Sequence, residues 1–266
     1  MKIGFIGFGN MASAIAKGMI ESKNFDYSDL IIFDHNPEKI SEIKSNGAKI
    51  GEDEKEVAGT CDILILAVKP HVMKDLLVKI KDEINKNKPL VISVATGLKI
   101  KFFEDILGQD ICLIRTIPNL NAKVLMSVTA VCENKNVTEK QREDFEKIFT
   151  SFGHIFDIPE QDFSAFGVLI GCGIAYIFLF YDSMARAAVK FGIKKDLALE
   201  AMCLNAKGAA ELIQSTKLHP AELIDMTCSP KGTTIEGIAS LMNENFQGSI
   251  INAFEKSYIK DLSMEN

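Results

Sequence analysis

The sequence predicts an α/β domain with a doubly wound, mainly parallel sheet, followed by an all-α domain. Three observations support this division. Short apolar segments alternate with helical patterns as far as Pro159, a glycine-rich turn follows the first of these segments, and only helical patterns occur after Asp162. Apolar strands separated by helices are typical of a parallel sheet that helices cover on both faces. We therefore expect one domain over residues 1–159 and a second over residues 160–266.

The first domain contains five segments with the composition of buried strands, over residues 2–7, 30–34, 62–68, 90–95 and 111–116. Helical patterns follow the first three, over residues 11–22, 36–47 and about 71–84. The second of these helices carries its own boundary signals. Asn36 suits the N-cap, Pro37 suits the first helical position, and Gly47 suits the end of the helix.

The composition excludes several classes of function. The chain has 266 residues, of which 47% are hydrophobic and 25% charged, and its net charge is −6. It has no lysine or arginine cluster, so we expect no nucleic acid and no anionic membrane surface as a partner. The six cysteines form no C-x-x-C pair and the four histidines lack metal-ligand spacing. We therefore expect reduced thiols, no metal ion and a cytoplasmic location.

One segment of the second domain could belong to a membrane helix or to a buried helix. Residues 165–181 contain no charged side chain, and Gly167 and Gly171 have the G-x-x-x-G spacing that lets membrane helices pack closely. The acidic residues Asp162 and Asp182 flank the segment, so it carries no positive-inside signal. Because a helix that is apolar all round is also typical of a protein interior, we expect a buried helix and no membrane.

Gly7, Gly9 and Ala12 form the pattern G-x-G-x-x-A between the first strand and the first helix. The first glycine permits a tight turn, the second lets the backbone approach a pyrophosphate, and the small third residue lets helix and strand pack closely. The amide groups at the start of the helix then face the phosphates. We expect a Rossmann-type dinucleotide site here, formed by Ile6, Gly7, Phe8, Gly9, Asn10 and Met11.

Asp34 ends the second strand, at the position where a carboxylate binds the ribose 2′-hydroxyl of NAD and repels the 2′-phosphate of NADP. No arginine lies nearby in the sequence, although Lys39 is within reach. The sequence therefore favours NADH as cofactor, with NADPH as the alternative. Asp34 also suits a second interpretation, as an Asx-type cap of the turn before Pro37.

The carboxyl ends of three further strands are predicted to line the ligand site, because ligands collect at that edge of an open parallel sheet. The residues concerned are Ala67, Val68, Lys69, Pro70, Ala95 and Asn119. The first five are assigned to the cofactor, and Asn119 is placed near the nicotinamide. The structural alternatives are a strand exit at which Pro70 starts a helix, and an ordinary turn at Pro118–Asn119.

The second domain has one segment with two interpretations. Residues 229–232 have the composition of a β-turn, and Thr233 with Glu236 matches a capping box that opens a helix. These signals are a sufficient structural account. The functional alternative is a carboxylate site, because the free N–H groups of a helix N-terminus bind anions and Thr234 adds a hydroxyl.

Together these motifs resemble the pyrroline-5-carboxylate reductase family. The segments that carry the resemblance are IGFGNMASAI, AVKPHVM, RTIPN, GCGIAY and HPAELIDMTCSPKGTTIEGI. They occur in the order and spacing of that family and cover nearly the whole chain. The resemblance implies that NAD(P)H reduces the cyclic imine 1-pyrroline-5-carboxylate to L-proline, a step of proline biosynthesis. It also implies a helical domain that interlocks in a homodimer, often within a larger oligomer, and would bury residues 165–181.

The resemblance further implies roles for individual residues. Thr234 is the catalytic residue and hydrogen-bonds the ring nitrogen, while the amide groups of Gly232, Thr233 and Thr234 bind the substrate carboxylate. The substrate site is completed by Gly171, Cys172, Gly173 and Asn119.

Two positions depart from the pattern of the family. Cys172 stands where the family usually has serine in the GCGIAY segment, with Ile174 in place of proline, and Lys231 stands where it usually has glycine. A thiol is a poorer hydrogen-bond donor than a hydroxyl, and a lysine adds a side chain beside the carboxylate pocket. We expect these changes to act on substrate affinity or identity, and to leave the fold and the cofactor unchanged.

Two other functions are compatible with this fold class. A 3-hydroxyacid dehydrogenase must deprotonate an alcohol, and such enzymes resemble one another in a lysine early on the long interdomain helix. No lysine occurs here between Lys147 and Lys190, which counts against this alternative. The other alternative is a non-catalytic NAD-binding regulator, which only the departures at Cys172 and Lys231 favour.

Overall fold

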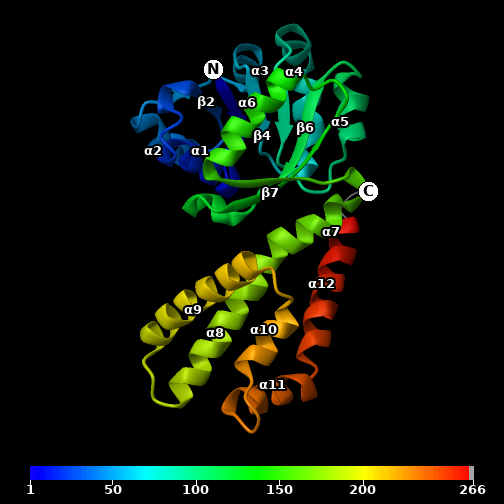
Figure 1. Cartoon of the computed structure of the whole chain (residues 1–266). Helices are drawn as coiled ribbons and strands as arrows, with labels where there is room; N and C mark the ends of the chain where they lie inside the picture. The colour runs from blue at the N-terminus through cyan, green and yellow to red at the C-terminus, as the bar shows by residue number, and fades with distance from the viewer. Residues whose placement is uncertain (264–266) are drawn as a thin grey trace. The chain divides into compact units, whose positions relative to one another are not determined.

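The computed structural model describes residues 1–263 and divides into two compact units. Among the described residues, the first unit contains residues 1–171 and 258–263, and the second contains residues 172–257. Figure 1 labels the helices and strands of both units.

The first unit is built on one sheet of eight strands in the order β3-β2-β1-β4-β5-β6-β7-β8. The strands are β1 (Ile3–Ile6), β2 (Leu30–Phe33), β3 (Lys49–Ile50), β4 (Ile63–Leu66), β5 (Leu90–Ser93), β6 (Cys112–Ile117), β7 (Ser127–Glu133) and β8 (Gly153–Asp157). Strands β1 to β6 are mutually parallel, β7 is antiparallel to β6, and β8 is parallel to β7. The predicted doubly wound, mainly parallel sheet is confirmed.

The five predicted strands are present, and the sheet also contains β3, β7 and β8, which the sequence analysis did not identify. The strand that ends at Ile117 is therefore not at the edge of the sheet. Strand β3 has only two residues, and β8 is largely exposed or half-buried. Neither strand has the continuous apolar character on which the prediction depended.

Helices cover both faces of this sheet. They are α1 (Asn10–Glu21), α2 (Pro37–Ser45), α3 (Glu54–Thr60), α4 (Pro70–Asn87), α5 (Ile100–Leu107) and α6 (Glu139–Phe149). The short 3-10 turns are η1 (Tyr27–Asp29), η2 (Leu120–Val124), η3 (Thr150–Phe152) and η4 (Glu160–Asp162). Residues of α1, α2 and α6 join one buried cluster, and residues of α3, α4 and α5 join the other.

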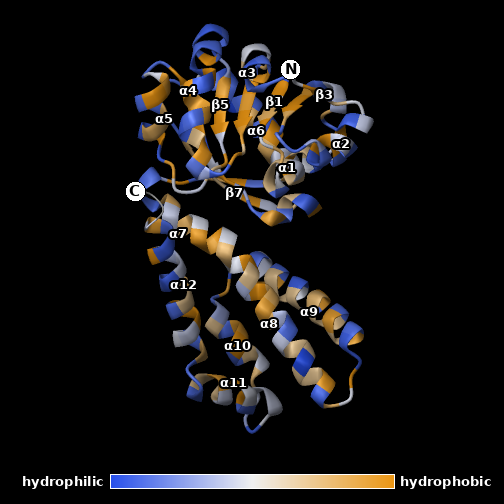
Figure 2. Ribbon diagram, turned by 180° about the vertical axis from the view of Figure 1, so that it is seen from behind, coloured by the Kyte–Doolittle hydropathy of each residue, from blue (hydrophilic) through white to orange (hydrophobic). Residues whose placement is uncertain are grey.

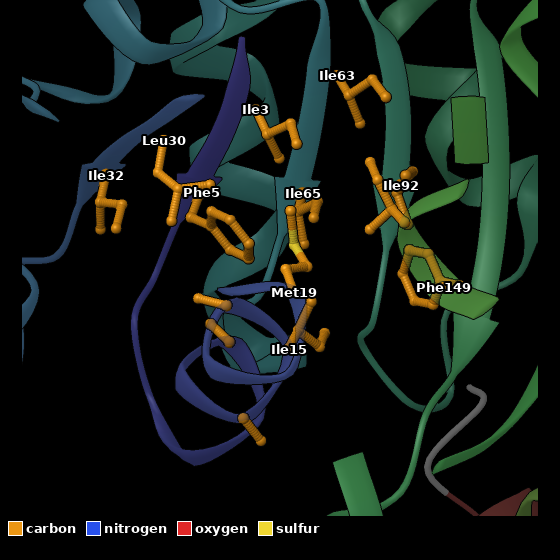
Figure 3. Close-up of a cluster of buried hydrophobic side chains, with 14 of the residues drawn as sticks. Ile3, Phe5, Ile15, Met19, Leu30, Ile32, Ile63, Ile65, Ile92 and Phe149 are labelled. Carbon is orange, nitrogen blue, oxygen red and sulfur yellow. The ribbon is translucent and has the colours of Figure 1, made fainter. Parts of the chain in front are cut away.

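Alternate residues of each central strand enter the two clusters. Figure 3 shows Ile3 and Phe5 of β1 on the same side of the sheet as Ile15 and Met19 of α1, whereas Ile6 belongs to the opposite cluster. Because successive side chains of a strand point to opposite faces, a strand covered on both sides must be apolar throughout. This is why the buried strands could be predicted as continuous apolar segments.

The predicted boundaries of helix α2 are confirmed. The Asn36 side chain accepts a hydrogen bond from the amide of Glu38 at 3.0 Å, and Pro37 is the first helical residue. The helix ends at Ser45, and Gly47 adopts a φ of +106°, in the left-handed region that favours glycine.

Helix α7 (Phe163–Gly167) and the π-helical turn η5 (Val168–Cys172) follow the sheet. Phe163 is fully buried, and the guanidinium of Arg115 on β6 lies 4.5 Å from the centre of its ring. A Cβ at Gly167 would lie 2.8 Å from Cδ1 of Ile117, whereas a Cβ at Gly171 would meet nothing within 4 Å. Helix α7 therefore packs against the Ile117 side chain at Gly167, where an added methyl group would require that side chain to move.

The second unit consists of helices. They are α8 (Gly173–Lys190), α9 (Lys195–Thr216), α10 (Pro220–Thr227), α11 (Thr233–Asn243) and most of α12 (Phe246–Leu262). Helices α8 and α9 lie side by side in Figures 1 and 2. The Tyr176 hydroxyl on α8 donates to the carbonyl of Ala253 on α12 at 3.2 Å and lies 2.6 Å from the Ser257 hydroxyl.

This helical unit exposes many large apolar side chains, and Figure 2 colours the hydrophobic residues along its helices orange. Helices α8 and α9 bury only Ala185 and Ala198, while Phe178, Leu179 and Leu204 are more than half exposed. Within residues 1–263, one helical segment, 160–190, is long and apolar enough to span a membrane by length and composition alone. Core helices of soluble proteins have the same properties, so this finding does not distinguish the two environments.

Candidate dinucleotide and substrate sites

The glycine-rich loop leaves the carboxyl end of β1, which lies between β2 and β4 in the sheet. Chain order reverses on the two sides of β1, and such a switch point is where open α/β sheets bind ligands. Gly7 has a φ of +84° and donates its amide to the carbonyl of Phe33 at 2.8 Å. A Cβ at Gly7 would lie 2.8 Å from the Ala67 carbonyl oxygen. Both the conformation and the close approach therefore require glycine.

Gly9 differs from Gly7, because nothing inside the chain requires it to be glycine. Its φ is −81°, and a Cβ there would meet nothing within 4 Å. Gly9 is the N-cap residue of α1 and provides no side chain to cap the first amide groups of that helix. Ala12 is almost fully buried against the sheet. The loop thus has the open surface and the free helix start that a pyrophosphate needs.

Asp34 lies directly against this loop. One carboxylate oxygen accepts the amide of Phe8 at 2.6 Å, and the other accepts the amide of Asn36 at 2.8 Å. The bond from the Asn36 amide forms an Asx turn, which is the structural role that the sequence also suggested for Asp34. The Nζ atom of Lys39 lies 3.7 Å from the carboxylate. Asp34 therefore joins the ends of β1 and β2 and places a negative charge beside the glycine loop.

A pocket of about 350 Å³ opens at the ends of β1, β2 and β4. The predicted cofactor residues Ile6, Gly7, Asp34 and Val68 line it, together with Phe33, His35, Glu54, Val72, Asp75, Leu76 and Lys79. Apolar walls with a few polar groups are typical of a site that holds a small organic ligand.

A charged group that the sequence analysis did not identify occupies one wall of this pocket. The Glu54 carboxylate is buried, lies 3.1 Å from Nε2 of His35 and accepts a hydrogen bond from Nζ of Lys79 at 2.6 Å. Burial raises the pKa of Glu54, but the hydrogen bond from Lys79 and the nearby positive charges outweigh burial and hold this pKa below its usual value of 4.5. Because Glu54 and Lys79 are 25 residues apart in the chain, no local pattern predicts the pair.

The remaining predicted cofactor residues lie on the same edge but do not line this pocket. Lys69 is the N-cap residue of α4 and Pro70 is its first residue. Pro70 therefore starts a helix, as the structural alternative for this segment predicted. Ala95 is buried and donates its amide to the Ser93 hydroxyl at 3.3 Å. Phe8 lines a second pocket of about 360 Å³, between α1 and α2.

Asn119 is nearly fully buried, with 4% of its surface exposed. Its side-chain oxygen accepts the amide of Val128 at 3.2 Å, and its side-chain nitrogen donates to the carbonyl of Ile170 at 3.2 Å. The amide side chain therefore bonds to the backbone of two other segments. The turn of the structural alternative is also present, because the Asn119 carbonyl accepts the amide of Ala122 at 3.2 Å at the start of η2.

The predicted capping box at Thr233 and Glu236 is wrong. Gly232 is the N-cap residue of α11, Thr233 is already the first helical residue, and the N-cap makes no side-chain hydrogen bond. The cause is the preceding turn, in which the Gly232 amide donates to the Ser229 carbonyl at 2.9 Å and starts the helix one residue early. A Cβ at Gly232 would contact the Ser229 hydroxyl and lie 3.0 Å from the Ser229 carbonyl oxygen, so a larger residue at this N-cap would require the Ser229 side chain to rotate.

The turn also places Lys231 at a φ of +59°. This left-handed conformation favours glycine, the residue expected here in the family that the sequence resembles, and costs a lysine about 1 kcal/mol. Elsewhere, Gly171 and Cys172 belong to the π-helical turn η5, and Gly173 begins α8. Among the described residues, no group of three or more His, Cys, Asp or Glu side chains could hold a metal ion.

These features define a class of protein, an NAD(P)-dependent oxidoreductase with a Rossmann-type domain. Residues 2–97 match the family model described as NADP oxidoreductase coenzyme F420-dependent, and residues 160–264 match the model described as pyrroline-5-carboxylate reductase dimerisation. The chain belongs to the pyrroline-5-carboxylate reductase family. The family predicted from the sequence is therefore confirmed.

Known proteins similar to the chain cover nearly its whole length. The pyrroline-5-carboxylate reductase of Escherichia coli is 36% identical over 96% of this chain and 95% of its own, and that of Aquifex aeolicus is 34% identical over 97% and 95%. The crystal structure of Plasmodium falciparum pyrroline carboxylate reductase, which has NADP bound, has a TM-score of 0.92 and 30% identity, covering 100% of this chain and 98% of that one. The Streptococcus pyogenes reductase has a TM-score of 0.89 and 34% identity, covering 99% and 98%.

We expect Glu54→Gln to lower the free energy of unfolding by about 1 kcal/mol at pH 7, because the buried carboxylate loses its charge-assisted hydrogen bonds. The pKa of Glu54 lies below 4.5 in the folded chain. The stabilisation is therefore present above pH 4.5 and is lost as the pH falls through the lowered pKa. Urea unfolding of both proteins between about pH 3 and pH 7 measures it.

The matched control for Glu54→Gln is Asp105→Asn, which removes the acid of an exposed ion pair with Lys101. Such pairs contribute little, so this variant should unfold like the parent protein at every pH. A Glu54→Gln difference that stays constant across this pH range would show that the carboxylate charge does not stabilise the fold.

Proposed function

We propose that the protein reduces 1-pyrroline-5-carboxylate to L-proline with NAD(P)H, as the names of its relatives indicate for those proteins. The observation that carries the proposal is the loop at the end of β1. Gly7 is required by the fold, whereas Gly9 is glycine although the chain leaves space for a Cβ there. A pyrophosphate that approaches the backbone closely accounts for that glycine. The relatives that match nearly the whole chain are named as reductases of this kind, and they give no support to the 3-hydroxyacid dehydrogenase or to the non-catalytic regulator.

The first domain, over residues 1–159, binds the dinucleotide in this proposal. The amide groups of Gly9, Asn10 and Met11 face the pyrophosphate, and the pocket beside Asp34 receives the adenosine half. Ala67, Val68, Lys69 and Pro70 follow β4, Ala95 follows β5, and all five lie along the rest of the cofactor. When bound, the reduced nicotinamide supplies the hydride.

The second domain, over residues 160–266, holds the substrate. The amide groups of Thr233 and Thr234 bind the carboxylate, because the N-cap of α11 provides no side-chain partner for them. The Gly232 amide, which the resemblance also assigned to the carboxylate, already donates to the Ser229 carbonyl at 2.9 Å. The hydroxyl of Thr234 hydrogen-bonds the ring nitrogen. A protonated imine is electrophilic at its carbon, so the protein mainly has to position the two reactants.

The surface of the helical unit supports a homodimer as the working form. Large exposed apolar areas are unfavourable on a soluble monomer, and the matching family model describes this region as a dimerisation domain. A second copy that covers α8 and α9 would bury side chains such as Phe178 and Leu204. This account needs no membrane. The six free cysteines suit the reducing conditions of the cytoplasm.

The experiment that tests the function measures oxidation of NADH and of NADPH in the presence of 1-pyrroline-5-carboxylate. We expect turnover with L-proline as product. We also expect kcat/KM with NADPH to exceed that with NADH by no more than about tenfold, or about 1.4 kcal/mol. The reason is that Asp34 places a carboxylate beside the ribose site, where only Lys39 offsets it.

The two parts of this prediction can fail separately. No substrate-dependent oxidation of either cofactor would contradict the proposed reaction. A preference for NADPH well above tenfold would leave the reaction intact but contradict the role given to Asp34, and would mean that Lys39 outweighs the carboxylate.

A second prediction concerns Thr234. We expect Thr234→Ala to lower kcat/KM for the imine by about tenfold or more, because one hydrogen bond to the reacting ring is lost. Neither Thr233 nor Thr234 is the N-cap residue of α11, so alanine at either position should leave thermal unfolding nearly unchanged. The dissociation constant of NADH should not change.

Thr233→Ala is the matched control, because it removes a neighbouring threonine hydroxyl and keeps the backbone amide. It should retain turnover close to that of the parent protein. If Thr234→Ala turned over as fast as Thr233→Ala, the segment would be a helix start without a catalytic hydroxyl.

A further inference from the structure

The π-helical turn η5 interrupts the long helical segment where the proposed substrate residues Gly171 and Cys172 lie. A π-helical turn accommodates one extra residue, closes i→i+5 hydrogen bonds and is often found at functional sites. Its carbonyl groups depart from the regular helical pattern, so donors from outside the helix can stabilise it. A donor outside the helix is therefore expected to stabilise the π-helical form of η5.

Asn119 provides such a donor. Its side-chain nitrogen donates to the carbonyl of Ile170 inside η5 at 3.2 Å, and the two residues are 51 positions apart in the chain. Its side-chain oxygen accepts the amide of Val128 at the start of β7 at 3.2 Å. The second bond fixes the orientation of the amide group and so aims the first bond at η5.

Only an amide side chain of this length fits both bonds. An aspartate can accept from Val128 but has no hydrogen to donate to Ile170 when ionised, and a serine is too short to reach both groups. Asn119 is also buried, so water cannot easily replace a lost partner. These bonds use one N–H and one oxygen lone pair of the side chain, and its burial leaves little access for the nicotinamide.

We propose that Asn119 is a positioning residue for the imine substrate, because it holds η5 and thereby fixes the directions of Gly171 and Cys172. The proposal rests on the proposed function. If η5 relaxed to a regular α-helical turn, the residues after it would rotate by about 100° relative to those before it. The wall of the substrate site would then change, while the glycine loop and the pocket beside Asp34 would not.

The test compares Asn119→Asp with Asn134→Asp. Asn134 is also buried, accepts the amide of Leu113 at 3.2 Å and donates to the carbonyl of Ile111 at 2.9 Å. It makes the same kind of bridge at the opposite end of β6, and its side-chain hydrogen bonds within the described residues are to Glu104, Ile111, Leu113 and Asn136, not to η5. Both variants lose a hydrogen bond from a buried amide nitrogen to a backbone carbonyl, and Asn134→Asp also loses the bond to the Glu104 carboxylate at 3.0 Å. The control is therefore at least as disruptive as the test variant.

We expect Asn119→Asp to raise KM for 1-pyrroline-5-carboxylate by about fivefold or more and to leave KM for NADH within about twofold. Asn134→Asp should change neither constant beyond about twofold, even if it lowers the temperature of unfolding by a similar amount. Should Asn119→Asp fail to fold, Asn119→Ser removes the same donor without adding a charge. The proposal would be overturned if Asn119→Asp changed KM for the imine and for NADH equally, or changed neither. It would also be overturned if Asn134→Asp raised KM for the imine to the same extent.

Hydrogen exchange separates this inference from the proposed function. We expect Asn119→Ser to speed exchange of the backbone amides over residues 165–176, and Asn134→Ser to leave them unchanged. If the parent protein did not reduce the imine, the proposed function would fail while this measurement would still decide whether Asn119 holds η5. Unchanged exchange in Asn119→Ser would overturn the positioning role whatever the substrate is.

Discussion

The close approach of Gly7 to the Ala67 carbonyl is the constraint on which the proposed nucleotide site depends. A Cβ at Gly7 would lie 2.8 Å from that oxygen, and the residue has a φ of +84°. The tight turn brings the start of α1 to the edge of the sheet and lets the Phe8 amide reach the carboxylate of Asp34 at 2.6 Å. The helix start and the acidic group are therefore positioned by the same contact.

Charged groups at this edge are balanced by nearby partners. Asp34 lies 3.7 Å from the Lys39 ammonium, and the buried Glu54 carboxylate binds Lys79 at 2.6 Å. A buried carboxylate without a partner would destabilise the fold. A second set of interactions anchors the segment after the sheet, because Glu160 accepts hydrogen bonds from the Ile100 amide at 2.7 Å and from Arg115 at 3.1 Å. These hydrogen bonds hold the chain to the sheet just before α7 and η5.

The sequence was informative where structure follows from neighbouring residues. The buried strands, the Asn36 cap and the Gly7 turn all depend on local composition, and the structure confirms them. Strand β3 has too few residues to show a pattern, and the capping box failed because the turn before Thr233 decides where the helix begins. The Glu54–Lys79 pair and the Asn119–Ile170 bond join residues 25 and 51 positions apart, so only the folded chain brings them together.

The most direct test of this account is NADH binding by Gly9→Ala, measured beside thermal unfolding. The chain has space for the added methyl group, so the temperature of unfolding should stay the same. The dissociation constant of NADH should rise by about tenfold or more, or about 1.4 kcal/mol, because the methyl group occupies the space assigned to the pyrophosphate. Unchanged NADH affinity in a folded Gly9→Ala variant would contradict the placement of the cofactor on this loop.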